Sequence, residues 1–248
     1  MITSSATLVR VALDPRKQPC PCGSGKRYKS CCWARDSLER ARGEAAGTAR
    51  AAQAGVDEVL RVFLPLVESR GEFAIACREG CDACCGNFVR ASLPEAIAIA
   101  QFLVEHPDVR ARFEAKLPGW RERGAPELGE LAALLERNGG PPAAGADREA
   151  YGRAGVSFGQ KRNLCPFDEG GRCEIYPVRP TVCRAVYVLD TAEFCTPGRG
   201  APRQVTHPAL DAAMLDAGRA MSRASLALGG KPYEEALPEI VARVLRSL

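Results

Sequence analysis

Twelve cysteines place the strongest constraint on what this chain can fold into, because they lie in clusters rather than being scattered. Eight of them form a split array, whose two halves are separated by the long segment 86–164. Closely spaced cysteines are typical of metal ligands. The sequence therefore predicts that folding brings the two halves together on metal. The eight-thiol array consists of Cys77, Cys81, Cys84 and Cys85 in the first half, and of Cys165, Cys173, Cys183 and Cys195 in the second.

A second, independent cluster lies near the N-terminus. It contains Cys20, Cys22, Cys31 and Cys32, which all fall in one short run of sequence. Four soft thiolates suit a closed tetrahedral zinc site. The glycines between the two pairs of thiols allow the backbone to turn tightly around an ion. Three basic residues nearby would offset the negative charge of a four-thiolate zinc centre. They are Lys26, Arg27 and Lys29.

The cellular context decides between metal ligands and disulfides. No stretch approaches the roughly 18 apolar residues that a membrane span needs, and residues 1–15 lack the apolar core of a signal peptide. We therefore expect a cytoplasmic protein with no membrane association. The cytoplasm keeps thiols reduced, which favours metal binding over disulfides.

Charge gives little support for a nucleic-acid partner. The formal net charge is +4, but that value counts every cysteine as neutral. Metal-bound cysteine is a thiolate, so twelve thiolates around three divalent ions would make the chain net negative. The arginines alternate with acidic residues, and the basic and aromatic residues are not interleaved as they are in single-strand binding surfaces.

The pattern predicts a mainly α-helical fold with short β-hairpins at the cysteines. A Ser92–Glu95 capping box predicts the start of one helix, and the Asp-Glu-Gly-Gly run at 168–171 predicts a hairpin turn. Residues 139–146 are rich in Gly, Pro and Ala, which indicates a loop. Apolar spacing predicts helices at 56–69, 92–105, 108–117, 126–138, 208–228 and 234–248.

Three regions follow from these patterns. Residues 19–33 form a small N-terminal metal knuckle. Residues 34–55 are rich in Ala, Arg and Glu without a strong apolar stripe, which indicates a linker or a solvated helix. Residues 56–248 form a cysteine-cluster domain with a helical insert between the two halves of the array.

The N-terminal cluster resembles the SEC-C motif, a small zinc knuckle found at the C-terminus of the preprotein-translocase motor ATPase and in many other bacterial proteins. The resemblance is carried by the run CPCGSGKRYKSCC at 20–32. The last ligand of the family is often His and here is Cys32, which zinc also accepts. The resemblance implies a zinc ion at this knuckle, which either docks a protein or ribosome partner or only stabilises the fold.

The eight-thiol array resembles the bacterial YkgJ-type cysteine-cluster proteins, which are described as a zinc- or iron-chelating domain. The shared pattern is C-x3-C-x2-CC followed by CPF and G-x-C-x-I-Y-x2-RP-x2-CR. Flagellin lysine N-methylases are similar in the same cysteines. That similarity implies a second hypothesis, an iron–sulfur enzyme that methylates protein with S-adenosylmethionine. The chain has no GxGxxG after a strand to support a nucleotide-type pocket.

The sequence leaves the chemistry of the array open. Eight thiols allow two four-thiolate sites, one binuclear site, or an iron–sulfur cluster plus a zinc. Whether the centre is catalytic is equally open. Arg179 and Arg184 bracket Cys183 and either donate to thiolates or pair with carboxylates. For the two histidines, His106 and His207, helix-end roles are favoured over metal ligation.

Overall fold

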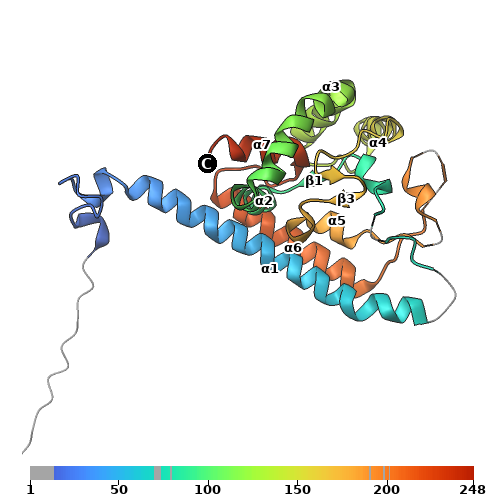
Figure 1. The fold of residues 1–248 in the computed structure, drawn as a ribbon, viewed down its shortest axis with the longest axis horizontal. Coiled ribbons are helices and arrows are strands. Elements are labelled where there is room, and N and C mark those ends of the chain that lie inside the picture. The colour runs from blue at the N-terminus through green and yellow to red at the C-terminus, as the bar shows by residue number, and fades with distance from the viewer. Residues whose placement is uncertain (1–13, 70–73, 79, 190, 198, 201) are drawn as a thin grey trace, which may run out of the picture. The chain divides into compact units, whose positions relative to one another are not determined.

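The computed structural model describes residues 14–69, 74–78, 80–189, 191–197, 199–200 and 202–248. These residues divide into two compact units, with the boundary between Gly43 and Glu44. Helix α1 (Trp33–Ser69) crosses that boundary, so residues 34–55 are helical. The predicted fold class is confirmed, because the described elements are mainly helices with two short antiparallel strand pairs (Figure 1).

The first unit is built from two short 3-10 helices and the beginning of α1. Helix η1 (Pro15–Lys17) is capped by Asp14, whose side chain accepts from the Arg16 backbone N–H. After η2 (Tyr28–Ser30), the chain enters α1. The Tyr28 ring meets the Trp33 ring edge-to-face at 5.4 Å, and the Tyr28 hydroxyl donates to Asp36 at 2.7 Å. An aromatic pair therefore joins the cysteine loop to the first turns of α1.

Helix α2 (Leu93–Glu105) forms the centre of the second unit. The predicted capping box is confirmed, since Ser92 and Glu95 exchange side-chain and backbone hydrogen bonds at the start of this helix. Residues 94–100 lack a solvated face, and all of them are buried. A short helix that has no solvated face is stable only when other elements surround it. It packs against α3 (Pro107–Asn138), α6 (Pro208–Ala227) and α7 (Leu237–Leu245) (Figure 1).

A short strand pair precedes two of these helices. Strand β1 (Arg90–Ala91) pairs antiparallel with β4 (Glu235–Ala236), with Arg90 opposite Ala236. Because β1 leads into α2 and β4 leads into α7, the pairing brings the starts of both helices together. Both C-terminal helices that the sequence predicts are present, although β4 delays the beginning of the last one to Leu237.

Helix α3 differs from the sequence-based expectation. The two separate helices predicted at 108–117 and 126–138 are wrong, because one helix continues through Pro118 and Pro126. Proline removes one helical hydrogen bond, but packing around it holds the helix together. Trp120 between the two prolines is buried, and a Cβ on Gly124 would lie 2.8 Å from the Phe158 ring.

Helix α4 (Gly145–Gln160) was not predicted from the sequence. It contains four glycines and few large apolar residues, so its pattern resembles a loop. Its buried residues are Ala154, Phe158 and Gly159. Phe158 packs against Trp120 of α3, whereas Gly159 lies against Asn87 and Pro197. The loop predicted at 139–146 therefore ends earlier than expected, at Ala144.

The predicted hairpin at the second cysteine cluster is confirmed. Strand β2 (Asp168–Glu169) pairs with β3 (Arg172–Cys173) through the two-residue turn Gly170–Gly171. Both glycines have positive φ, at 59° and 83°, as a tight hairpin turn requires. The ring of Phe167 stacks on Phe113 of α3 at 4.4 Å, so the hairpin is fixed to the helical core.

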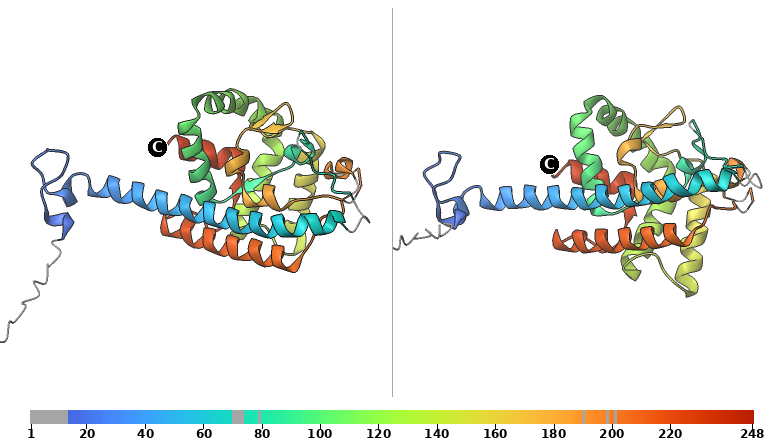
Figure 2. Two further views of the ribbon diagram at one scale, coloured as in Figure 1. Left: turned by 60° about the horizontal axis from the view of Figure 1, so that its bottom comes forward. Right: turned by 90° about the horizontal axis from the view of Figure 1, so that it is seen from below.

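Two long helices form a smaller cluster beside the main core. The later part of α1 runs alongside α6 (Figure 2), and Val56 and Leu60 pack against Leu210. Earlier in α1, Ala45, Ala46 and Ala49 are buried in the main core. This face consists of alanines, so a pattern of large apolar residues does not reveal it. The small side chains let the helices approach closely.

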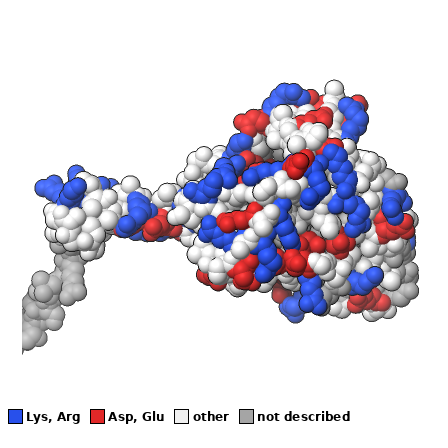
Figure 3. Space-filling view, turned by 45° about the horizontal axis from the view of Figure 1, so that its top comes forward, with Lys and Arg blue, Asp and Glu red and all other residues white. Residues whose placement is uncertain are grey.

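Charged side chains are interleaved on the surface of the second unit. Lys and Arg alternate with Asp and Glu across the visible face (Figure 3). Many pair directly, as Arg121 does with Glu239 through two contacts of 2.7 Å. Nowhere in the described ranges does a helix combine the length and the apolar character needed to cross a membrane.

Candidate metal centres

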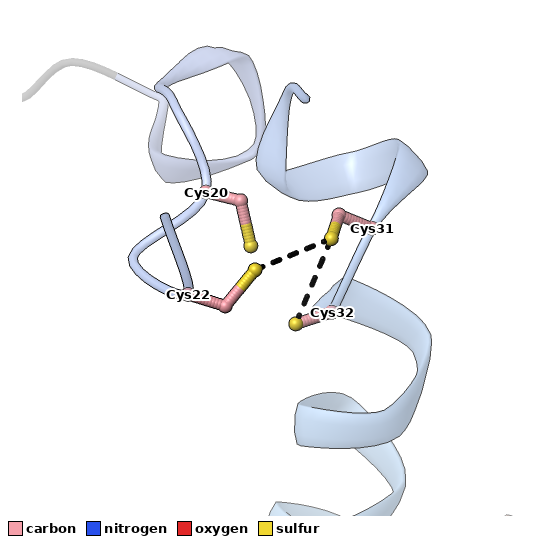
Figure 4. Close-up of side chains that lie close together, drawn as sticks. All are labelled: Cys20, Cys22, Cys31 and Cys32. Carbon is pink, nitrogen blue, oxygen red and sulfur yellow. Dashed lines mark hydrogen bonds between the residues drawn. The ribbon is translucent and has the colours of Figure 1, made fainter. Parts of the chain in front are cut away.

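The N-terminal knuckle brings four thiols to one point. The sulfur atoms of Cys20, Cys22, Cys31 and Cys32 all lie within 4.8 Å of one another, and all four side chains point inward (Figure 4). The Cys22 and Cys31 sulfurs are 3.5 Å apart, and the Cys31 and Cys32 sulfurs are 3.8 Å apart. In the part of the chain that the structure describes, no other group of Cys, His or acidic ligand atoms is as tight.

Local backbone bonds produce this arrangement. The N–H of Cys20 donates to the carbonyl of Lys26 at 2.8 Å, which closes the loop between the two thiol pairs. Within that loop Gly23 and Gly25 adopt φ values of 76° and 71°, which favour glycine. Helix η2 then turns the chain so that Cys31 and Cys32 face the first pair.

The geometry fits zinc. Zinc binds thiolate sulfur at about 2.3 Å, so the sulfurs at the corners of a tetrahedral site are about 3.8 Å apart. The two sulfur–sulfur distances of 3.5 and 3.8 Å are close to that value. Four thiolates would hold the ion without leaving an open coordination position, and such closed sites are structural.

Two thiols of the knuckle differ strongly in pKa. Hydrogen bonds from Ser24, and from Cys20 and Cys31, lower the pKa of Cys22 to about 6. Hydrogen bonds to Cys20, Cys22 and Cys31 raise the pKa of Cys32 to about 12. Four adjacent thiols cannot all ionise without a compensating charge. A bound dication supplies that charge and makes all four thiolates compatible.

Residues 16–34 match the SEC-C motif. The match covers both thiol pairs and the first two residues of α1, so the geometry and the family comparison agree on the same segment. The SEC-C knuckle is therefore a cysteine cluster that could hold a metal ion. No curated protein and no solved structure matches the chain.

The two halves of the eight-thiol array are adjacent in the second unit. The Cys165 N–H donates to the Cys85 carbonyl at 2.8 Å, and the Asn87 side-chain amide donates to the Cys195 carbonyl at 3.0 Å. The Val188 N–H donates to the Cys77 sulfur at 3.3 Å. All eight thiols lie in the described ranges, but no three of their sulfurs meet the 4.8 Å spacing of the knuckle. Metal binding by the array stays a prediction.

Burial is the largest cause that raises the pKa of five thiols of the array, which are Cys77, Cys165, Cys173, Cys183 and Cys195. It raises the pKa of Cys165 to about 12 and that of Cys195 to about 11. The hydrogen bond between Cys84 and Cys85 has the largest effect on both of these thiols, because it lowers the pKa of Cys84 to about 7 and raises the pKa of Cys85. The charge of Arg179 lowers the pKa of Cys84 further. One thiol therefore ionises readily among neighbours that stay protonated unless a cation binds them.

The two arginines of the second half have different partners. Arg184 is buried and donates to Asp57 of α1 and to the carbonyls of Pro177 and Arg179, so it braces the chain rather than contacting a thiol. The Arg179 guanidinium lies over the Tyr176 ring at 3.9 Å. The charge of Arg179 also lowers the pKa of Cys77 and Cys173, against the larger effect of burial.

Both histidines have structural partners at helix ends. His106 lies between α2 and α3, and its Nδ1 is 2.8 Å from the Phe102 carbonyl. His207 caps α6, where its ring nitrogen accepts from the Ala209 N–H at 3.2 Å. Neither histidine joins a cysteine cluster in the described structure.

Sequence patterns did not reveal three residues that hold the segment of Cys183 in place. Gln53 and Asp57 of α1 and Glu95 of α2 bond the segment that carries Cys183. Each contact joins positions that are far apart in the sequence, so no local spacing reveals it. The only local pattern among these three residues was the capping box, which predicts the bond of Glu95 to Ser92 but not its bond to Thr181.

Proposed function

We propose that this chain is a zinc-binding scaffold protein, with one ion in the SEC-C knuckle and further metal in the eight-thiol array. The observation that carries the proposal is the convergence of four cysteine sulfurs within 4.8 Å in the knuckle. Soft thiolates favour zinc over the hard cations that prefer oxygen ligands. A closed four-thiolate site stabilises a fold rather than activating a substrate.

For the array, the support is chain adjacency and family resemblance. Hydrogen bonds join the segments of Cys85 and Cys165 and the segments of Cys77 and Val188. The motif CPF followed by RP-x2-CR resembles the YkgJ-type domain. The all-cysteine ligand set resembles closed structural sites rather than catalytic zinc sites, which keep an open coordination position, and this favours a scaffold over an enzyme. Iron–sulfur clusters are also held by cysteines, so the metal analysis below decides between zinc and iron.

We also propose that the SEC-C knuckle docks an acidic protein surface. Its support is a group of exposed cations around the thiols, for which no ion pair is found among the described residues. Charge of one sign on a small module steers association with a surface of opposite sign. A net charge of −2 on the four-thiolate zinc site would offset only part of this group. The four cations are Lys17, Lys26, Arg27 and Lys29.

Metal analysis of the full chain tests the first proposal. The protein is purified without oxygen, and zinc, iron and acid-labile sulfide are measured per chain together with the visible spectrum. We expect colourless protein with about three zinc ions, the number that twelve thiolates fill at four per ion. Brown protein containing sulfide would overturn the zinc assignment in favour of an iron–sulfur centre.

Charge reversal tests the docking proposal. Lys26→Glu combined with Lys29→Glu should weaken binding to an immobilised acidic protein at least tenfold, and added salt should weaken wild-type binding in the same way. Arg61→Glu combined with Arg219→Glu, two exposed cations on α1 and α6, is the matched control. Equal binding by all three proteins, or binding to purified ribosomes alone, would contradict an acidic protein as the partner.

A further inference from the structure

The four thiols of the SEC-C knuckle differ in their exposure to solvent. Cys20 is buried, with 5% of its surface exposed, whereas Cys22 is exposed and Cys31 and Cys32 are half-buried. The loop that carries Cys22 is open as well, because every residue from 21 to 27 is exposed. A reagent dissolved in water therefore reaches the four thiols of this centre through Cys22 first.

The surroundings of Cys22 favour a reaction at its sulfur. Reactive cysteines are partly exposed and lie in positively charged surroundings. The exposed loop that carries Cys22 also carries Lys26 and Arg27, and Lys29 follows shortly after it. A zinc ion in the knuckle would hold Cys22 as a thiolate, which is the nucleophilic form of cysteine. Exposure, positive charge and ionisation thus combine at one ligand of the proposed zinc site.

The position of Cys31 makes it the partner for a disulfide with Cys22. The two sulfur atoms are 3.5 Å apart (Figure 4), and a disulfide bond is about 2.0 Å long, so a small movement joins them. The α-carbons of disulfide-bonded cysteines are usually about 4.4–6.8 Å apart, but those of neighbouring residues are only about 3.8 Å apart. A bond between the adjacent residues Cys31 and Cys32 is therefore disfavoured, although their sulfurs are also close, at 3.8 Å.

We propose that peroxide oxidises the SEC-C knuckle at Cys22, which forms a disulfide with Cys31 and releases the zinc ion. This inference rests on the zinc ion that the proposed function assigns to the knuckle. The Cys22 thiolate attacks one peroxide oxygen and breaks the O–O bond, which gives a sulfenic acid at Cys22 and hydroxide. The Cys31 thiolate then attacks the Cys22 sulfur, so that the S–S bond forms while the S–O bond breaks and a second hydroxide leaves. The two thiolates lose two electrons to peroxide, and two protons from the solvent convert both hydroxides to water.

The disulfide removes two of the four zinc ligands of the knuckle. Only Cys20 and Cys32 keep a free thiol, whereas a closed structural zinc site uses four ligands. Thiol reductants reverse such a bond by thiol–disulfide exchange. The knuckle therefore holds its ion under reducing conditions and releases it when peroxide is present.

Mass mapping of wild-type protein tests this reaction directly. The reduced, zinc-loaded full chain is treated with hydrogen peroxide, free thiols are capped with N-ethylmaleimide, and a colorimetric metal indicator follows the release of zinc. We expect peptides linked through Cys22 and Cys31, which form at the rate at which about one zinc ion per chain leaves the knuckle. Dimedone added with the peroxide should label the sulfenic acid at Cys22. Dithiothreitol with added zinc should restore the ion.

Two histidine substitutions provide a matched pair of variants. Histidine also binds zinc but forms no disulfide. Cys22→His removes the thiol that peroxide attacks, whereas Cys32→His leaves both Cys22 and Cys31 in place. We expect Cys32→His to release its knuckle ion in peroxide and Cys22→His to retain it. The protein with Cys20→Ser and Cys22→Ser lacks the knuckle site and measures any zinc that the array releases under the same treatment.

The outcomes separate this inference from the proposed function. Untreated wild-type protein with no more zinc than the Cys20→Ser, Cys22→Ser protein would refute zinc in the knuckle. Wild-type protein that contains this ion but keeps it in peroxide, or releases it without a Cys22–Cys31 link, would leave the proposed function intact and overturn the inference.

Three further results would also overturn the inference. They are a disulfide between Cys31 and Cys32 in place of the expected one, a dimedone label on a knuckle thiol other than Cys22, and release of the knuckle ion from Cys22→His at the wild-type rate. If either histidine variant binds no zinc, the disulfide and the dimedone label mapped in wild-type protein decide the question without it.

Discussion

The Glu95 carboxylate on α2 accepts hydrogen bonds from both the backbone N–H and the hydroxyl of Thr181, at 2.8 and 2.9 Å. Glu95 is completely buried. Its other oxygen accepts from the N–H and hydroxyl of Ser92, each at 2.8 Å. One carboxylate therefore joins the start of the central helix to the start of α5 (Thr181–Ala185), close to Cys183 in the chain.

Removing this carboxylate should destabilise the second unit strongly. Glu95→Ala leaves the buried donors of Ser92 and Thr181 without an acceptor, and each unsatisfied donor costs about 1–3 kcal/mol. We expect the free energy of unfolding to fall by at least about 3 kcal/mol, measured by urea denaturation followed by circular dichroism. Glu95→Gln keeps one acceptor oxygen and should lose less.

The control for this prediction is Glu114→Ala, which removes an exposed carboxylate from α3. Glu114 pairs with Arg110 across one helical turn, with both side chains at least 40% exposed. Exposed pairs of this kind contribute about 0.3–0.5 kcal/mol. If the Glu95→Ala and Glu114→Ala proteins have the same free energy of unfolding, the buried hydrogen bonds of Glu95 make no net contribution to stability.

Glu95 also shows how far the sequence could predict this fold. Its capping box was predictable, because Ser and Glu at the right spacing suffice to specify it. The bond to Thr181 was not predictable, because it joins two positions that are distant in the sequence. Helix α3 illustrates the same limit: Pro118 and Pro126 indicated a break, and only the packing around Trp120 explains why the helix continues.

The candidate sites divide in the same way. The knuckle is encoded within the single short run 20–32, so its ligands and its turns could be predicted together. In the array, the eight cysteines could be named as candidate ligands, and their metal binding stays a prediction. Which of their segments lie side by side depends on the Cys85–Cys165 backbone bond and on the packing of η3 (Ala83–Gly86) against η5 (Ala192–Cys195), which no spacing in the sequence specifies.

The hairpin turn offers a matched pair of glycine substitutions. A Cβ on Gly171 would lie 2.6 Å from the Gly80 carbonyl oxygen, whereas a Cβ on Gly170 would meet nothing within 4 Å. Both glycines have positive φ, so either alanine carries strain of about 1–2 kcal/mol. Gly171→Ala must also displace the Gly80 backbone. We expect it to be about 1–3 kcal/mol less stable than Gly170→Ala in thermal or urea unfolding.

If the two glycine variants unfold at the same denaturant concentration, the hairpin and the Gly80 loop are not in contact in solution. Zinc content gives a second measure of the same contact. Because Cys81 follows Gly80 directly, Gly171→Ala should also release zinc from the array faster than Gly170→Ala, with the knuckle ion unaffected.

The SEC-C knuckle should lose its metal without unfolding the second unit. Cys20→Ser combined with Cys22→Ser removes two of the four converging thiols, and the unit that contains them ends at Gly43. We expect one zinc ion fewer per chain and an unchanged unfolding midpoint for the helical signal. Lys29→Ala, an exposed change in the same unit, controls for effects unrelated to the metal. Loss of the whole metal complement would contradict an independent knuckle.

The contact between α3 and α4 should depend on pH through Glu127. This carboxylate accepts from the Ser157 hydroxyl at 2.7 Å and from the Lys161 ammonium at 2.6 Å. Burial raises the pKa of Glu127, but the bonds from Lys161 and Ser157 outweigh it, so the net pKa lies below its ordinary value of 4.5. A lowered pKa in the folded state means that the charged form stabilises the fold above that value, and that this stability is lost as the pH falls through the folded-state pKa.

Glu127→Gln should therefore lose about 1.5–3 kcal/mol of unfolding free energy at pH 7, the usual range for hydrogen bonds to a charged group. The difference from wild type should shrink as the pH falls from 5 to 3, because the wild-type carboxyl then becomes neutral as well. Urea unfolding at pH 7, 5, 4 and 3 measures both quantities, and Glu130→Gln on the exposed side of α3 provides the control. A stability difference that stays constant from pH 7 to pH 3 would mean that the ionised carboxylate does not hold α3 to α4.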